Sequence, residues 1–175
     1  MNDKELVAHA ALEYVKDNSI IGLGTGSTAN IFIEMLAEKI RSRSLNISVV
    51  ASSVSSQQKA HDAGLKYISL DQITEIDLYV DGADEITNNL EILKGRGFDL
   101  IREKLLAKIS KQFIVIGDNS KIVYKIGQNY PIPIESTPIA WKITKNLIEK
   151  IAKKCIVRGN MEKNAFAITS YGNFV

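Results

Sequence analysis

The sequence predicts an α/β fold in which helices cover both faces of a parallel sheet, followed by a small α+β unit. Three observations predict it. Short apolar segments typical of buried strands alternate with segments whose apolar residues recur at helical spacing. A glycine-rich loop, GLGTGST at 22–28, joins the first of these strands to the next helix. After the YPIPIE segment at 130–135 the regular alternation stops, which marks the change from one unit to the other.

The first elements follow one another as in a βαβ unit. Residues 5–15 carry apolar side chains at helical spacing, and 19–23 is a short apolar run that indicates a buried strand. The glycine loop then leads into a second helical stripe, which contains Ile31, Phe32, Met35, Leu36 and Ile40. Strand, glycine loop and helix in this order favour the opening of a βαβ unit.

The same alternation continues to about residue 130. It predicts strands at 47–51, 67–70, 76–80 and 113–116, and helices at 55–63 and 100–109. Strands that are apolar along their whole length are typical of a parallel sheet that is buried on both faces. We therefore expect residues 1–130 to form one Rossmann-like domain.

Residues 131–175 are predicted to form a second, smaller α+β domain. An amphipathic helix is expected from about 138 to 152, followed by short strands at 155–157 and 166–169. The sequence ends with YGNFV, directly after the last strand candidate. No capping turn or polar tail follows, so the ending is abrupt.

The composition excludes several classes of protein. The 175 residues include 22 basic and 20 acidic ones, and the resulting net charge of +2 is too small to indicate nucleic-acid binding. The single cysteine, Cys155, and two histidines in separate segments provide neither a disulfide framework nor a cysteine or histidine metal cluster. No apolar run approaches the roughly 18 residues of a membrane span. We expect a cytoplasmic protein that binds neither nucleic acid nor membrane.

Three loops that follow strands carry the residues expected to bind a ligand, because ligands of open parallel sheets bind beyond the carboxyl ends of the strands. In the glycine loop, Thr28 is predicted to cap the next helix. The N–H groups of Ala29, Asn30 and Ile31 would then be free to bind an anion or a sugar hydroxyl. The loop matches neither the Walker nor the GxGxxG pattern. The alternative is a tight turn that needs glycine only for its backbone conformation.

The second loop is the acidic segment DGADE at 81–85, directly after the strand 76–80. The strand is expected to bring Asp81 and Asp84 to the edge of the site, and Gly82 lets the backbone approach a ligand. Coordination of Mg²⁺ and binding of sugar hydroxyls both suit these carboxylates. An acidic surface turn is the alternative.

The third loop, KGRG at 94–97, precedes a helix that carries Glu103. The helical neighbours of Glu103 are the apolar residues Leu100, Leu106 and Ala107, so we expect this face to be partly buried. Burial would raise the pKa of Glu103, which is useful in a general base. A solvent-exposed glutamate is the alternative. A weaker candidate is Lys121 in the turn DNSK, which would either bind a phosphate or remain solvated.

Taken together and in this order, these segments resemble the type A ribose-5-phosphate isomerases over essentially the whole chain. The matching segments are GLGTGSTA, the SS-x-x-S stretch from residue 52, YVDGADEI, LKGRG followed by REK, IGDNSK, PIPIE and TSYGNFV. The resemblance implies interconversion of ribose 5-phosphate and ribulose 5-phosphate in the pentose phosphate pathway. It also implies that no metal or cofactor is needed, and we expect a homodimer. Because chains of this family normally continue beyond the GNF-type segment, the resemblance further implies that the small α+β domain at 131–175 is incomplete at the C-terminus.

The resemblance also implies a role for each matching residue. The glutamate of the REK motif, Glu103, accepts the proton, and Lys94, Asp84 and Asp81 complete the catalytic group. The implied substrate-binding residues are Thr28, Ala29, Asn30, Ile31, Asp81, Gly82, Ala83, Asp84, Lys94, Gly95, Arg96, Gly97 and Lys121.

Aldose–ketose isomerisation agrees with these roles. It needs a base that moves a proton from C2 to C1, and it needs stabilisation of the negative charge on the enediolate. Glu103 would be the base and Lys94 would neutralise the oxyanion. Asp84 would move a proton during ring opening or between O1 and O2.

Arg96 is a departure from the family pattern, because many members carry glycine at this position. Arg96 either adds a phosphate donor or points into solvent. The alternative function is a non-catalytic sugar-phosphate-binding module, or a decayed enzyme on the same fold. The intact set of Glu103, Lys94, Asp81 and Asp84 argues against that alternative, whereas the short C-terminus argues for it.

Overall fold

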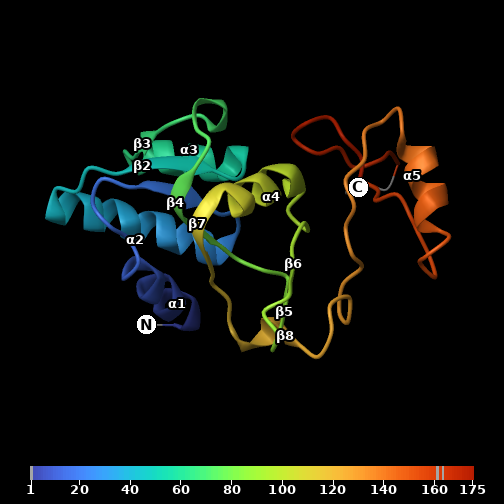
Figure 1. Ribbon diagram of the computed structural model, residues 1–175, viewed down its shortest axis with the longest axis horizontal. Coiled ribbons are helices and arrows are strands. Elements are labelled where there is room, and N and C mark those ends of the chain that lie inside the picture. The colour runs from blue at the N-terminus through green and yellow to red at the C-terminus, as the bar shows by residue number, and fades with distance from the viewer. Residues whose placement is uncertain (1, 161, 163) are drawn as a thin grey trace.

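The centre of the molecule is a five-stranded parallel sheet with the strand order β3-β2-β1-β4-β7 (Figure 1). The computed structural model describes residues 2–160, 162 and 164–175. The strands are β1 (Ile20–Leu23), β2 (Ser48–Ala51), β3 (Lys66–Tyr67), β4 (Ile76–Asp81) and β7 (Ser110–Val115). All four neighbouring pairs run parallel, which confirms the predicted α/β fold. The chain first adds β2 and β3 on one side of β1, and it then adds β4 and β7 on the other side. The switch point of the sheet therefore lies between β1 and β4.

Helices cover both faces of this sheet, as predicted. The helices α1 (Asp3–Leu12), α2 (Ser27–Arg43) and α3 (Val54–Asp62) pack on one face, and α4 (Leu100–Ile109) packs on the other. Alternate strand residues face the two sides, because successive side chains of a strand point in opposite directions. Val80 belongs to the core under α1 and α2, whereas Tyr79 packs with Leu106 of α4.

A second, three-stranded sheet was not predicted. It contains β6 (Ile92–Leu93), β5 (Glu85–Thr87) and β8 (Ile122–Val123), in the order β6-β5-β8. Strands β5 and β6 form an antiparallel hairpin, and the Asp84 N–H donates to the Leu93 carbonyl at 2.8 Å. This hairpin therefore places Asp84 beside Lys94, although the two are ten residues apart in sequence.

Most of the predicted elements of the main sheet and its helices agree with the structure to within three residues, but two predictions there are wrong. The predicted strand 67–70 is reduced to β3, and Leu70–Gln72 forms the 3₁₀ helix η1. Thr28 does not cap α2, because the helix already begins at Ser27 and Gly26 occupies the cap position. Gly26 has a φ of 112°, a conformation that suits glycine.

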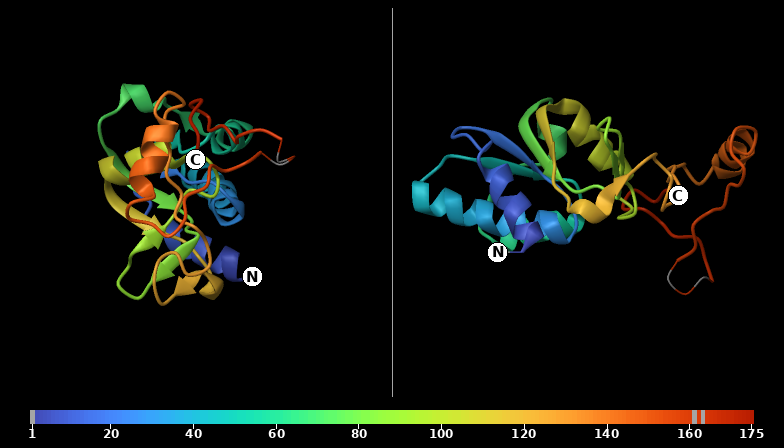
Figure 2. Two further views of the ribbon diagram at one scale, coloured as in Figure 1. Left: turned by 90° about the vertical axis from the view of Figure 1, so that its right-hand side faces the viewer. Right: turned by 90° about the horizontal axis from the view of Figure 1, so that it is seen from below.

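The C-terminal part differs more from its prediction. Helix α5 spans only Trp141–Ile148, and no regular strand forms at 155–157 or 166–169. Isolated bridges join Ser136 to Phe174, Gly159 to Phe166 and Ile168 to Phe174. The rings of Trp141, Phe166 and Phe174 pack edge to face. Both figures place α5 at the opposite end of the molecule from α1 and α2 (Figures 1 and 2). The division at residue 130 remains a prediction.

Within the part of the chain that the structure describes, no helix has both the length and the apolar character needed to cross a membrane.

Candidate active site

A cavity of about 230 Å³ opens at the carboxyl ends of β1 and β4, at the switch point of the sheet. Its walls come from the glycine loop, the DGADE segment, the KGRG loop, helix α4 and the 3₁₀ helix η2 (Asn119–Lys121). The predicted residues that line it are Thr28, Ala29, Gly82, Ala83, Asp84, Lys94, Gly95, Arg96, Gly97, Glu103 and Lys121. The loops expected to meet at this edge of the sheet therefore do meet there.

Asn30 and Ile31 do not line the cavity. Because α2 begins at Ser27, the Asn30 N–H already donates to the Gly26 carbonyl at 2.9 Å. The N–H groups without a helical partner belong to the first turn, Ser27 to Ala29, and these three residues do line the cavity. The expected anion-binding turn thus lies two residues earlier than predicted.

Asp81 also lies outside the cavity wall, because its side chain is fully buried beneath it. Its Oδ1 accepts hydrogen bonds from the Thr25 N–H at 3.1 Å and the Gly82 N–H at 2.7 Å. Any side chain at Gly24 would collide with this carboxylate. The buried Tyr79 hydroxyl donates to Oδ2. Asp81 therefore joins the ends of β1 and β4 from below and has no exposed surface with which to contact a sugar.

The serines of the SS-x-x-S stretch support the glycine loop from the side. Ser53 and Ser56 form a capping box at the start of α3. The Thr25 hydroxyl lies 2.8 Å from the Ser52 hydroxyl and donates to the Ser53 hydroxyl at 2.7 Å. Thr25 is thereby fixed at the cavity wall.

The Lys94 ammonium group is largely buried and uses all three of its donors. Its Nζ lies 2.8 Å from Asp81 Oδ2, 2.8 Å from the Gly82 carbonyl and 3.2 Å from Glu103 Oε1. Burial disfavours the charge, but the carboxylates of Asp81 and Glu103 outweigh it and raise the pKa of Lys94. Lys94 is therefore charged and held in one position.

Glu103 is buried, as the sequence predicted. Only 6% of the residue is exposed, and among the described residues its Oε2 atom has no hydrogen-bond partner. Burial raises the pKa of Glu103, and the negative charges of Asp81 and Asp84 act in the same direction against the opposing effect of Lys94. A carboxylate with a raised pKa and a free oxygen at a cavity wall is suited to accept a proton.

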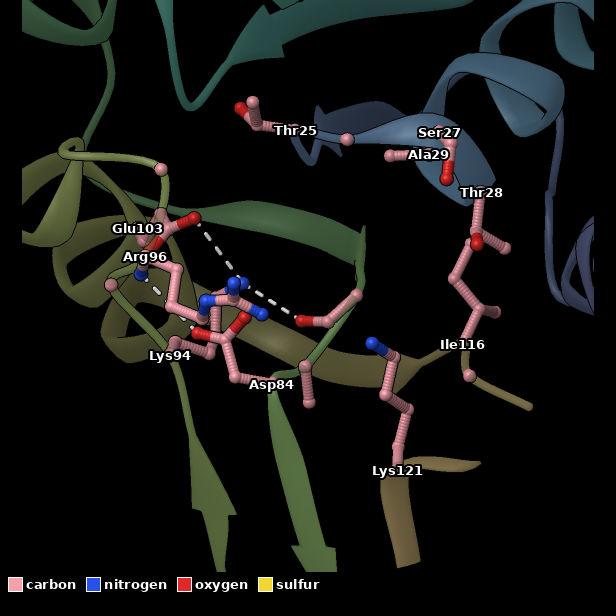
Figure 3. A pocket seen from close by; sticks show the side chains of 16 residues that line it. Thr25, Ser27, Thr28, Ala29, Asp84, Lys94, Arg96, Glu103, Ile116 and Lys121 are labelled. Atoms are coloured by element: carbon pink, nitrogen blue, oxygen red, sulfur yellow. Dashed lines mark hydrogen bonds and ion pairs between the residues drawn. The ribbon is translucent and has the colours of Figure 1, made fainter. Parts of the chain in front are cut away.

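The cavity has two chemically different sides (Figure 3). Glu103, Lys94, Asp84 and Arg96 lie on one side, and the dashed line between Glu103 and Lys94 marks their ion pair. The first turn of α2 and Lys121 lie on the other side. Helix N-termini and lysines bind anions, so the second side suits a phosphate.

Sequence reasoning missed Lys4 and Tyr79. Lys4 Nζ donates to the Ser27 hydroxyl at 2.8 Å, next to the first turn of α2. It lies 23 positions before Ser27, in a helix whose own pattern is ordinary, and only the packing of α1 against α2 brings the two together. Tyr79 occupies an apolar strand, so its role under Asp81 leaves no local sequence signal.

The third acidic residue of the DGADE segment points away from the cavity. Glu85 is buried and accepts N–H groups from Gly127, Asn129 and Tyr130 at 2.6, 2.5 and 3.0 Å. Burial favours a higher pKa for Glu85, but these hydrogen bonds outweigh it and lower the pKa. Across the described residues, no group of three or more His, Cys, Asp and Glu side chains is arranged to hold a metal ion.

Comparisons with known proteins agree with one another. The family model described as ribose 5-phosphate isomerase A (phosphoriboisomerase A) matches residues 48–175. The ribose-5-phosphate isomerase A of Prochlorococcus marinus strain MIT 9312 is 39% identical over 173 residues, which cover 98% of this chain and 73% of the relative.

Two solved structures are also closely similar. Ribose 5-phosphate isomerase A from Methanocaldococcus jannaschii has a TM-score of 0.91 and 34% identity, covering 97% of this chain and 76% of the other. A D-ribose-5-phosphate isomerase in complex with phospho-erythronic acid has a TM-score of 0.90 and 39% identity, covering 99% of this chain and 78% of the other.

Proposed function

This chain belongs to the ribose 5-phosphate isomerase A family, an aldose–ketose isomerase family, and we propose that Glu103 is the base with which it interconverts ribose 5-phosphate and ribulose 5-phosphate. The observation that carries the proposal is the buried Glu103 carboxylate at the wall of the cavity, whose Oε2 has no hydrogen-bond partner among the described residues. The alternative of a binding module without activity finds no support, because the relatives and structures reported above are named as isomerases.

The proposed reaction is a proton transfer between neighbouring carbons. Glu103 takes the proton from C2 of the open-chain aldose, and the resulting enediolate takes it back at C1. The raised pKa of Glu103 makes it a stronger base than an exposed glutamate and keeps the protonated intermediate accessible. Asp84, which lines the cavity beside Lys94, would move the proton between O1 and O2 and assist ring opening.

Lys94 and Asp81 hold the base in this proposal and do not contact the sugar. All three Lys94 donors are occupied, and one of them fixes Glu103 Oε1. The other carboxylate oxygen, Oε2, is then left for the substrate. Asp81 keeps Lys94 in place from below.

The phosphate group would bind on the opposite side of the cavity. The first turn of α2, whose N–H groups have no helical partner, and Lys121 line this side. Lys4 adds a positive charge beside Ser27. This arrangement would place the sugar carbons between the phosphate side and Glu103.

Replacement of the base tests the proposal. In the Glu103→Gln variant we expect at least about a thousandfold loss of turnover, because the amide cannot accept the proton. Binding of ribose 5-phosphate, measured by calorimetry, should remain within about tenfold, because the phosphate contacts are unchanged. Glu38→Gln, an exposed position on α2, is the matched control. Near-normal formation of ribulose 5-phosphate by Glu103→Gln would remove Glu103 from this role.

We also propose that the enzyme acts in the cytoplasm as a homodimer. The support for self-association is the set of apolar side chains that remain exposed in the C-terminal part, such as Ile139 at 94% and Ile151 at 90%. Sedimentation equilibrium at micromolar concentration tests the assembly, and a monomer there would contradict it.

A further inference from the structure

The Lys94 ammonium group already has three partners around the base. An ammonium group has three N–H donors, and those of Lys94 are directed at Asp81, Gly82 and Glu103. A fourth partner would require one of these contacts to break. A second cationic donor on this side of the cavity would therefore add to the stabilisation of the oxygen that becomes negative in the reaction.

Arg96 is the other cationic side chain on this side. It lines the cavity with Glu103, Lys94 and Asp84, and its backbone N–H donates to Asp84 Oδ2 at 3.2 Å. Figure 3 shows its side chain running from the loop toward Asp84 and the interior of the group, not away from it. The sequence left two alternatives for Arg96: a hydrogen-bond donor to the substrate phosphate, or a side chain that points into solvent. Arg96 lines the same side of the cavity as Glu103, away from the side that suits the phosphate, so its position supports neither alternative.

The guanidinium group of Arg96 is held in position without being neutralised. Its central carbon lies 4.0 Å from the centre of the Tyr130 ring, and the backbone of Tyr130 is fixed by the buried Glu85. The Arg96 carbonyl accepts a hydrogen bond from Arg158 at 3.1 Å. Within the described residues no carboxylate forms an ion pair with the guanidinium. Stacking on an aromatic ring leaves the N–H groups in the guanidinium plane free to donate.

We propose that Arg96 donates a hydrogen bond to O1 of the substrate and stabilises the enediolate charge, an inference that rests on the proposed function of Glu103. When Glu103 removes the C2 proton, the C–H electron pair forms the C1=C2 double bond. The carbonyl π pair moves onto O1 as a negative charge, next to the guanidinium. No bond to Arg96 forms or breaks, and Arg96 keeps all its protons. Asp84 then moves the O2 proton to O1, which transfers the negative charge to O2. The O2 electron pair forms the C2 carbonyl while the C1=C2 pair takes the proton from Glu103 at C1.

The same contact predicts a class of inhibitor. A sugar-acid phosphate carries a carboxylate where the enediolate carries its charged oxygen, so it would pair with Arg96 at one end and bind through phosphate at the other. Phospho-erythronic acid, the ligand of the related enzyme described above, belongs to this class. Inorganic phosphate occupies only the phosphate end and serves as the comparison probe.

The experiment uses Arg96→Met, which keeps an unbranched side chain as far as the position of Nε and removes the hydrogen-bond donors. Arg96 is solvent-exposed, so the variant is expected to fold, and circular dichroism checks this. We expect kcat to fall by at least about tenfold and inhibition by phospho-erythronic acid to weaken by at least about tenfold. KM for ribose 5-phosphate should change less than kcat, and inhibition by inorganic phosphate should not change. Arg96→Lys should recover part of kcat, and Arg43→Met, at an exposed position on α2, is the matched control.

Two results would overturn the inference. One is an Arg96→Met enzyme whose kcat and inhibition by phospho-erythronic acid both stay within about twofold of the original. The other is an equal weakening of inhibition by inorganic phosphate, which would assign Arg96 to the phosphate end. Failure of the proposed function has a different signature, namely turnover by Glu103→Gln. Direct binding of phospho-erythronic acid and of inorganic phosphate to Arg96→Met, measured by calorimetry without turnover, keeps the test of Arg96 separate from that of Glu103.

Discussion

At the scale of single residues, the two oxygens of Glu103 have different environments. Oε1 lies 3.2 Å from the Lys94 ammonium group, whereas Oε2 is buried without a partner among the described residues. An ion pair alone would lower the pKa of Glu103, but burial and the carboxylates of Asp81 and Asp84 prevail and raise it. The residue therefore combines a fixed orientation with the basicity that proton transfer requires.

The raised pKa of Glu103 predicts the pH dependence of turnover. The base acts only when it is deprotonated, so kcat should fall as the pH drops through the pKa of Glu103 in the substrate complex. This acid limb should lie above the ordinary glutamate value of 4.5. Because the phosphate of the substrate itself titrates near pH 6, kcat is the parameter to measure instead of kcat/KM. An acid limb at or below 4.5 would contradict the assignment.

At the scale of elements, the C-terminal segment braces the helix that carries Glu103. Glu135 Oε2 accepts the Ile101 N–H at 3.3 Å, in the first turn of α4. Its Oε1 accepts from the Thr169 hydroxyl at 2.7 Å and from Asn173 Nδ2 at 3.0 Å. The Ser170 hydroxyl donates to Asp99, at the cap of α4, at 2.7 Å. The PIPIE and TSYGNF segments of the sequence therefore meet at the start of α4.

The brace predicts that Glu135→Ala affects catalysis from outside the cavity. Loss of these hydrogen bonds should lower the free energy of unfolding by about 1–2 kcal/mol. It should also lower kcat by several-fold with little change in KM, because α4 and Glu103 lose their alignment while the phosphate side stays intact. Urea denaturation and steady-state kinetics measure the two effects. Glu13→Ala, at an exposed position after α1, is the control. A stability loss with unchanged kcat would limit Glu135 to a structural role.

The elements also show which parts of the fold a sequence can predict. Strands β1, β2 and β4 are mostly apolar, and apolar residues recur at helical spacing in the helices around them. These two patterns were enough to predict the main sheet. Strands β5, β6 and β8 have two or three residues each, which is too short for any periodicity. In the C-terminal part, Phe166 and Ile168 form single bridges where the apolar pattern predicted a strand.

The site was predictable to a similar degree. Glycine loops, acidic strand ends and the apolar neighbours of Glu103 are local signals, and the residues they indicated mostly line one cavity. Contacts that depend on packing between distant segments were not predictable, such as Lys4 on Ser27 and Tyr130 under Arg96. The burial of Asp81 was missed for the same reason, since the glycine loop that covers it lies 56 residues earlier.

At the scale of the whole molecule, the three carboxylates of the DGADE segment point into three different regions. Asp81 points under the cavity to the glycine loop and Lys94, and Asp84 faces the cavity. Glu85 points into the second sheet and holds the backbone at 127–130. A hard divalent cation needs several oxygen ligands around one point, whereas these three side chains diverge from the end of one strand.

This divergence predicts that turnover survives removal of divalent cations. After dialysis against EDTA, kcat and KM should match those of the untreated enzyme, because Lys94, Arg96, Lys121 and the first turn of α2 already provide positive charge around the cavity. Formation of ribulose 5-phosphate measures turnover, and the melting temperature shows whether the fold is affected. Loss of activity that added Mg²⁺ restores would instead mean that Asp84 and a second carboxylate converge on a cation when substrate is bound, and would return the DGADE segment to the metal-binding alternative.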